Sequence, residues 1–180
     1  NIDFVSLFFV NGNLHFAFDC GSGRGKIEMT GKNYNDNLWH TVVFSRKGSN
    51  GELRVDDEVK TVNANKKTSA LNVVSPIYLG GLPDSVAMNL SARNHFRSEN
   101  NSHQAPSRVV PFFGCLRNFK IQGVEQPFSS GKAFDVVPCQ GNVEFGTFFH
   151  YSGGYVQMED DVRVDKRVEM HISIKPRKTE

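Results

Sequence analysis

The stretch from Tyr34 to Arg46 constrains the fold of this chain more than any other. It opens with Asn and Asp residues at positions 35–37, which hydrogen-bond readily to the backbone and favour a turn. From Trp39 onward the side chains alternate between two faces, as in a β-strand, with His40 on the face opposite Trp39. A single tryptophan at the start of a β-branched strand predicts a large core anchor. The stretch therefore predicts a turn followed by a central strand.

Short apolar runs separated by turn signals occur along the rest of the chain. Residues 3–19 predict a hairpin, because Asn11-Gly12 lies between two strand-like runs and both residues tolerate positive φ. Further strands are predicted at 24–29, 52–56, 76–83, 109–121, 146–156 and 168–177, and loops at 57–70 and 84–108. No segment sustains the apolar period of a helix, so the sequence predicts an all-β protein.

Size and composition set limits on the class of protein. A length of 180 residues allows one domain, or one domain and part of another. No apolar run approaches the length of a membrane span, and a net charge of +2 means that any polyanion-binding patch must be local. The chain begins at Asn1 inside a strand-like run, which is expected of a mature fragment of a longer secreted chain.

Signals for catalysis are weak. The six histidines fall in no metal-binding spacing, and the chain has no G-x-S-x-G, P-loop or C-x-x-C motif. The carboxylates of Asp56-Asp57 and Asp160-Asp161 are adjacent in sequence, so each pair would point to opposite faces of a strand rather than across a cleft. No nucleic-acid-binding module is evident. We therefore expect a binding module, with a glycan-processing enzyme as the least favoured alternative.

Five motifs, in this order, resemble those of laminin G-like modules. They are the Asp19-x-Gly21-Ser22-Gly23 turn, the Trp39-His40 strand, Tyr78-Leu79-Gly80-Gly81-Leu82-Pro83, Phe113-Gly114-Cys115-Leu116-Arg117-Asn118 and the closing Cys139. The resemblance covers about residues 4–139, and a similar pattern restarts at Gly146. The chain looks most like the C-terminal modules of a laminin α chain, while agrin, perlecan and neurexins share the fold.

The resemblance implies an antiparallel β-sandwich of jelly-roll type. Residues 1–139 would form a module that lacks its first strands, and residues 140–180 would be a linker and the opening strands of a following module. A second arrangement is left open, in which the tail supplies the strands that the first piece lacks.

Several covalent features follow from the resemblance or from motifs. The family pattern implies a disulfide between Cys115 and Cys139, with two free buried thiols as the alternative, and leaves Cys20 as a buried free thiol. Two sequons predict N-glycosylation at Asn89 and Asn100 in the long polar loop.

The resemblance also implies a Ca²⁺ site at one rim of the module. The Asp19 carboxylate and the Tyr34 carbonyl match two of the family's ligands, and hard cations accept such oxygen donors. Asp84, Asn89 and Asn94 are candidates for the third ligand, with Asn89 closest in spacing. The alternative is that Asp19 only caps a turn.

Basic residues make a second candidate site. Arg46 and Lys47 lie where some laminin modules carry a heparin-binding cluster, and Lys66, Lys67 and Arg117 would extend it. Arginine binds sulfate through two N–H groups and lysine as a point charge. The alternative is that these side chains are scattered and merely solvated. The basic tail from Lys175 to Lys178 is left out of the predicted patch.

The resemblance implies a secreted, non-catalytic adhesion module of the extracellular matrix and basement membrane. Its expected partners are heparan sulfate and receptors such as α-dystroglycan, integrins or syndecans, with possible assistance from Ca²⁺, and neither nucleic acid nor membrane insertion is expected. The leading alternative is a protein-recognition module of the neurexin, agrin or perlecan type.

Overall fold

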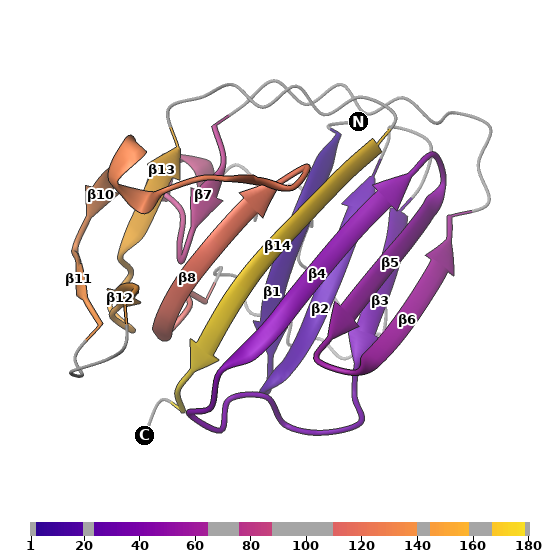
Figure 1. The fold of residues 1–180 in the computed structure, drawn as a ribbon, viewed down its shortest axis with the longest axis horizontal. Helices are drawn as coiled ribbons and strands as arrows, with labels where there is room; N and C mark the ends of the chain where they lie inside the picture. Colours follow the sequence, from indigo (N-terminus) through magenta and orange to yellow (C-terminus); the bar gives the residue numbers. More distant parts are fainter. Residues whose placement is uncertain are drawn as a thin grey trace.

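A computed structural model describes residues 3–19, 24–64, 76–87, 110–139, 145–158 and 167–178. These residues form short antiparallel strands, as the all-β prediction requires (Figure 1). The strands are β1 (Phe4–Val10), β2 (Asn13–Asp19), β3 (Arg24–Met29), β4 (His40–Lys47), β5 (Asn50–Val55), β6 (Glu58–Asn63), β7 (Tyr78–Leu79), β8 (Gly114–Ile121), β9 (Val124–Glu125), β10 (Gly131–Phe134), β11 (Val136–Pro138), β12 (Thr147–Phe149), β13 (Tyr155–Met158) and β14 (Arg167–Pro176). One 3-10 turn, η1 (Phe128–Ser130), precedes β10.

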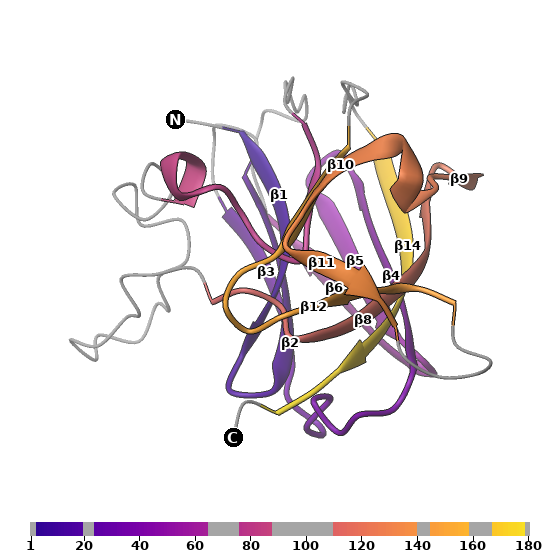
Figure 2. The ribbon, with the colours of Figure 1, turned by 90° about the vertical axis from the view of Figure 1, so that its left-hand side faces the viewer.

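Two sheets pack face to face, and a third closes one end. The large sheet has the order β11-β12-β8-β14-β4-β5-β6, with β9 paired to β8. The sheet β1-β2-β3 lies behind it in Figure 1, and Figure 2 shows the two layers from the side. The short sheet β10-β13-β7 lies at the end of the sandwich (Figure 1). The predicted antiparallel β-sandwich is therefore confirmed.

Alternation along β4 explains how the core is built. His40, Val42 and Phe44 point inward and are buried. Phe16 and Phe44 meet across the two layers with their ring centroids 5.4 Å apart. Burial of such apolar side chains is the main favourable term in folding.

Trp39 does not occupy the place expected of it. It is only partly buried, and it lies on the side of the sheet that faces away from the core, where the Arg117 guanidinium stacks 3.9 Å from its ring centroid. The alternation of faces was predicted correctly, but the assignment of the tryptophan to the core was wrong. His40, Val42 and Phe44 occupy the buried face of this strand. Because side chains alternate, the neighbouring Trp39 points to the opposite, outer face.

The tail of the chain is built into the large sheet. β14 pairs with β4 on one side and with β8 on the other. Its inward residues Met170, Ile172 and Ile174 are each at most 6% exposed. Residues 147–176 thus supply strands to the same sandwich as residues 4–138 and do not stand apart from it in this structure. The module boundary near 139–144 stays a prediction, because residues 140–144 lie outside the described ranges.

One strand falls inside a segment that was predicted to be loop. β6 occupies Glu58–Asn63, pairs with β5 and forms an edge of the large sheet. Its sequence is largely polar because an edge strand needs few core side chains, so the apolar signal was too weak to reveal it.

The described residues contain no helix with the length and apolar character needed to cross a membrane.

The position of β14 predicts that one substitution in the tail weakens the whole fold. Ile172→Ala removes a buried side chain opposite Val42 and should lower the free energy of unfolding by about 2–5 kcal/mol. Urea unfolding followed by Trp39 fluorescence measures this. The control Ser173→Ala, on the opposite face of β14, should cost no more than about 1 kcal/mol. An unchanged Trp39 transition in Ile172→Ala would show that the tail is not part of the same cooperative unit.

Candidate functional site

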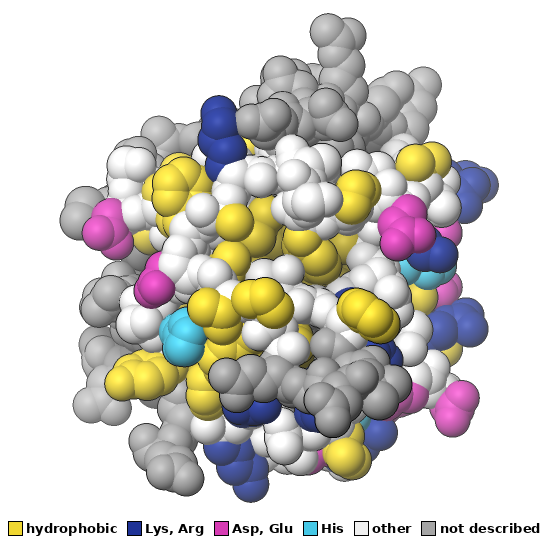
Figure 3. Space-filling model, turned by 60° about the vertical axis from the view of Figure 1, so that its left-hand side comes forward, with side chains coloured by type: hydrophobic (Ala, Val, Ile, Leu, Met, Phe, Trp, Pro, Cys, Tyr) yellow, Lys and Arg dark blue, Asp and Glu magenta, His cyan; other side chains and the backbone are white. Residues whose placement is uncertain are grey.

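The outward face of the large sheet carries more accessible cations than unpaired acids. Alternation along the strands turns Lys47 of β4, Arg117 of β8 and Lys175 of β14 away from the core. Arg177, just beyond β14, is exposed on the same side. We call these four residues the basic face. Figure 3 gives an oblique view, with Lys and Arg side chains along the right-hand and lower margins and hydrophobic ones over the centre.

The acids on this face already have cationic partners. Glu52 lies 3.6 Å from Arg54, and Glu169 lies 3.4 Å from Arg167. Glu169 also accepts a 2.9 Å hydrogen bond from His171, and this bond lowers the pKa of the Glu169 carboxyl. These local pairs cancel the negative charge nearby, so the potential over the basic face is positive.

Strand register places several of these side chains in one row across the sheet. Phe148 of β12 lies opposite Cys115 of β8, and Cys115 lies opposite Lys175 of β14. The β14–β4 pairing ends at Ile174 opposite His40, so continuing that register by one residue places Trp39 beside Lys175. Residues paired directly across antiparallel strands share a face. The row therefore runs from Phe148 through Lys175 to Trp39 on the outer surface.

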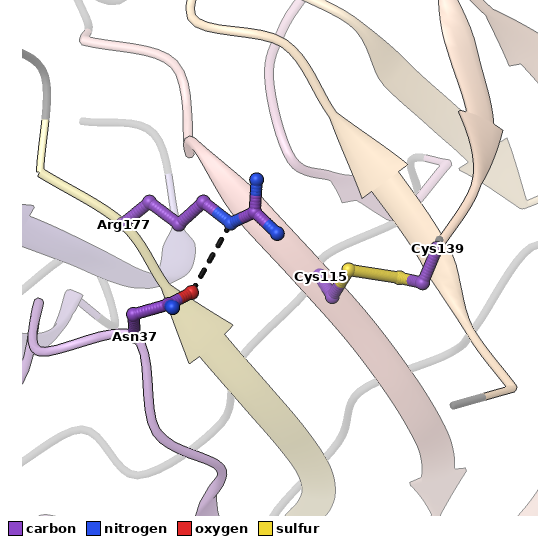
Figure 4. The surroundings of a disulfide bond; sticks show 4 residues. All are labelled: Asn37, Cys115, Cys139 and Arg177. Carbon is purple, nitrogen blue, oxygen red and sulfur yellow. Dashed lines mark hydrogen bonds between the residues drawn. A yellow bond between two sulfur atoms is a disulfide. The ribbon is translucent and has the colours of Figure 1, made fainter. Parts of the chain in front are cut away.

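Each end of this row has an arginine on an aromatic ring. Arg117 stacks on Trp39 at 3.9 Å, and the Arg177 guanidinium lies 5.0 Å from the centroid of Phe148. Arg177 also donates from Nε to Asn37 Oδ1 at 3.2 Å, as Figure 4 shows. Such cation–π contacts hold a charged group in place while leaving its charge intact.

The predicted disulfide is present, and one of its cysteines, Cys115, belongs to this row. Cys115 and Cys139 are bonded, and Figure 4 shows the bond close to Arg177. It joins the start of β8 to the residue that follows β11, so it ties the edge strand β11 to β8, two strands further into the large sheet. By constraining the unfolded chain, such a loop contributes about 3 kcal/mol.

The glycan-binding residues predicted from the sequence have different outcomes. Lys47 and Arg117 face outward, whereas Arg46 is 0% exposed and points into the sandwich, so it cannot reach a soluble glycan here. The prediction for Arg46 overlooked the alternation that turns neighbours to opposite faces. Lys66 and Lys67 lie outside the described residues.

The residues predicted to bind calcium do not come together. Asp19 ends β2, whereas the Tyr34 N–H donates to the Gly12 carbonyl beside the start of β2. The length of β2 separates them by about 20 Å, so they do not share one ion in this structure. Asn89 lies outside the described ranges, as do Cys20 and the sequon residue Asn100. Within those ranges no group of three or more His, Cys, Asp or Glu side chains is placed to hold a metal.

Three members of the site were missed from the sequence. Lys175 and Arg177 were set aside as part of a basic tail, and Phe148 was assigned only to a strand. The alternation of residues 168–177 did indicate that Lys175 lies on the polar face of its strand. What the sequence could not show is that this strand lies between β4 and β8.

The turn that leads into Trp39 is held by a buried histidine. The two ring nitrogens of His40 lie 2.8 Å from Asp56 Oδ2 and 3.0 Å from Asp36 Oδ1. Carboxylates only accept, so both contacts are hydrogen bonds when each nitrogen carries a proton. The backbone N–H groups of Leu38 and Thr41 donate to Asp36 and Asp56, each at 2.9 Å. This network fixes the turn and thereby the position of Trp39.

The same network sets the ionisation of its carboxyl groups. Partial burial by itself would raise the pKa of Asp36 and of Asp56, but hydrogen bonds from His40 and from backbone N–H groups outweigh it. Both pKa values are therefore lowered from the ordinary 3.8. Beside them, burial and a 2.8 Å hydrogen bond to Glu58 raise the pKa of the Tyr34 hydroxyl.

These shifts predict acid sensitivity of the turn. Because the carboxyl pKa values are lower in the folded state, their stabilisation is fully present well above the ordinary pKa of 3.8 and is lost as the pH falls through the lower folded-state values. Asp56→Asn should lower the unfolding free energy at pH 7 by about 1–3 kcal/mol and flatten this acid dependence. Thermal unfolding between pH 7 and pH 3 measures both. Asp57→Asn, at the exposed neighbour, is the control, and an equal effect there would contradict the assignment.

Comparisons with known proteins agree with the fold and the motifs. The family model described as Laminin G domain matches residues 1–124. Laminin subunit alpha-4 of Mus musculus is 33% identical over 178 residues, which is 97% of this chain and 9% of that protein. Laminin subunit alpha of Drosophila melanogaster is 28% identical over 180 residues, 97% of this chain and 5% of that protein. Neurexin-3a of Danio rerio is 33% identical over 122 residues, 68% of this chain and 7% of that protein.

The chain thus spans less than a tenth of the length of these relatives. Laminin alpha chains are secreted proteins of the extracellular matrix and basement membrane, and the similarity to them covers nearly the whole chain. The match to the family model covers more than half of it. This chain belongs to the laminin G domain family.

Proposed function

We propose that this chain is an extracellular adhesion module that binds acidic glycans, such as heparan sulfate, on the outer face of its large sheet. The observation that carries the proposal is the basic face, where Arg117, Lys175 and Arg177 gather while nearby Glu52 and Glu169 are already paired. Family membership supports an adhesion or recognition role rather than an enzymatic one.

The spacing of these cations suits a polyanion. Arg177 and Arg117 lie on rings whose backbones are three strand spacings apart, or about 14 Å. Lys47 lies farther along β4, about 26 Å from Trp39. Cations at these separations can contact successive acidic groups of one extended chain. Such contacts are largely exposed, so each contributes modestly and is screened by salt.

The proposed partners follow from this chemistry. A glycan chain of heparan sulfate, on a receptor such as a syndecan, or the acidic glycan of α-dystroglycan presents the carboxylate or sulfate groups that arginine and lysine bind. Integrins are proposed as protein partners on the basis of the family resemblance alone. Calcium at Asp19 is a separate proposal, and the glycan contacts described here do not depend on it.

Protein recognition is the second candidate function. It is favoured by the similarity to Neurexin-3a and by the exposure of large apolar side chains, with Tyr151 70% and Phe145 88% exposed. Exposed apolar groups of this size are common at protein-binding surfaces. Salt sensitivity distinguishes the two functions, because an apolar contact does not weaken as salt rises.

The glycan proposal predicts salt-dependent heparin binding through the basic face. Calorimetric titration at low ionic strength should show binding that Arg117→Ala together with Lys175→Ala weakens about tenfold, and that Lys47→Ala weakens less. Lys132→Ala, on the β10-β13-β7 sheet, is the matched control and should leave affinity unchanged.

The same titration separates the alternatives. Repeating it with added Ca²⁺ and then with EDTA tests the calcium proposal independently, since a change on chelation would point to a bound metal ion. Absence of heparin binding at low salt would reject the glycan proposal and favour a protein partner.

A further inference from the structure

We infer that the two arginine–aromatic pairs, Arg117 on Trp39 and Arg177 on Phe148, form with Lys175 a subsite that recognises the spacing of acidic groups along a stiff polysaccharide. The inference rests on the proposed function and deepens it, because it assigns the same outer face a narrower class of ligand. It concerns the geometry of the cations as well as their charge.

The backbone fixes the separation of the two pairs. Phe148, Cys115 and Lys175 are joined by the register of β12, β8 and β14, and Trp39 follows in the same row. Hydrogen-bonded strands lie about 4.8 Å apart, so three steps separate the backbones at Phe148 and Trp39 by about 14 Å. The disulfide from Cys115 to Cys139 holds the strands at the β12 end of the row. The backbones that carry the two supporting rings are therefore held at a set distance, and Lys175 lies between them in the row.

Each guanidinium is restrained before any ligand binds. Arg117 is half-buried against Trp39 at 3.9 Å, which favours a stacked arrangement. Arg177 lies 5.0 Å from Phe148, donates to Asn37, and donates its backbone N–H to the Phe113 carbonyl at 2.9 Å. A side chain already held in one arrangement loses less conformational freedom on binding.

The supporting ring is itself packed in place. Phe148 meets Phe113 edge to face, with ring centroids 5.7 Å apart, and meets His150 in the same way at 4.9 Å. Tyr151 packs edge to face on Phe113 at 6.0 Å. This aromatic group makes Phe148 a positioning residue for Arg177. It does not need to touch the glycan for the subsite to work.

This arrangement favours one class of polyanion over another. Arg117 Nε is buried and Arg177 Nε donates to Asn37, so the two Nη groups of each guanidinium are the ones that could form parallel hydrogen bonds to a carboxylate or sulfate. A stiff sulfated or uronic-acid polysaccharide carries such groups at regular intervals. Two of its acidic groups can therefore bind both guanidinium groups at once. A flexible, densely charged polyanion adapts to any set of cations and gains nothing from their exact placement.

Charge-conserving substitutions test the inference. Arg117→Lys and Arg177→Lys keep the positive charge but remove the planar stack and the two-pronged hydrogen bonding. Titration of the whole chain at one ionic strength would compare a series of heparin oligosaccharides, from the disaccharide upward, with inorganic polyphosphate. The double variant should lose about tenfold in affinity for the longer oligosaccharides and less than about twofold for polyphosphate.

Two further variants complete the test. Arg54→Lys makes the same chemical change on the same face, where Arg54 pairs with Glu52 at 3.6 Å, and should change either affinity by less than about twofold. Phe148→Leu should reproduce the loss seen in Arg177→Lys, because it removes the ring that positions the guanidinium. Thermal unfolding of each variant shows that the fold is kept.

The outcomes separate this inference from the broader proposal. Equal losses for heparin and polyphosphate, or no loss for either, would overturn the spacing subsite while leaving glycan binding by charge intact. The inference would also be overturned if Arg54→Lys lowered the affinity for heparin oligosaccharides as strongly as the double variant does. If the unsubstituted chain binds neither ligand, the proposed function itself fails.

Discussion

The pairing of β14 with both β4 and β8 is the interaction on which the rest of the structure depends. It joins the early part of the chain to the late part in one continuous sheet. Its inward residues complete the core against Val42 and Phe44, and its outward residues put Lys175 into the basic row. Without this strand the large sheet would present two open edges, and unpaired edges favour aggregation.

The two faces of the large sheet have separate roles. The inner face is mainly apolar, with His40 and Arg46 buried in it, and it packs on the β1-β2-β3 sheet. The outer face carries charges, and most of its acids have neighbouring cations. Because side chains alternate between the two faces along a strand, one backbone can satisfy both requirements at once. This is why the same strand can stabilise the sandwich and present a binding surface.

Much of the fold was predictable from local patterns. The hairpin at Asn11-Gly12, the alternation along β4 and the Cys115–Cys139 disulfide were all expected and are present. The strand at 168–177 was also expected, but its partners were not, because pairing between segments far apart in the sequence leaves no periodic signal. β6 was missed because its edge position allows a polar sequence.

The candidate site was less predictable for the same physical reason. Lys47 and Arg117, predicted to bind glycans, do face outward, whereas Arg46, predicted to bind beside them, is buried by the alternation of its strand. Trp39 was expected in the core and instead supports Arg117. A site that is assembled across β12, β8, β14 and β4 depends on strand order, which composition and spacing along the chain do not reveal.

Nuclear magnetic resonance of the labelled chain, titrated with a heparin oligosaccharide, tests the central claim most directly. We expect the Trp39 indole signal and the side-chain Nε signals of Arg117 and Arg177 to shift together, with one dissociation constant. Signals from the β1-β2-β3 sheet should remain unchanged. The largest shifts on that sheet, or at Asp19, with the three row signals unmoved, would contradict the assignment of glycan binding to the outer face of the large sheet.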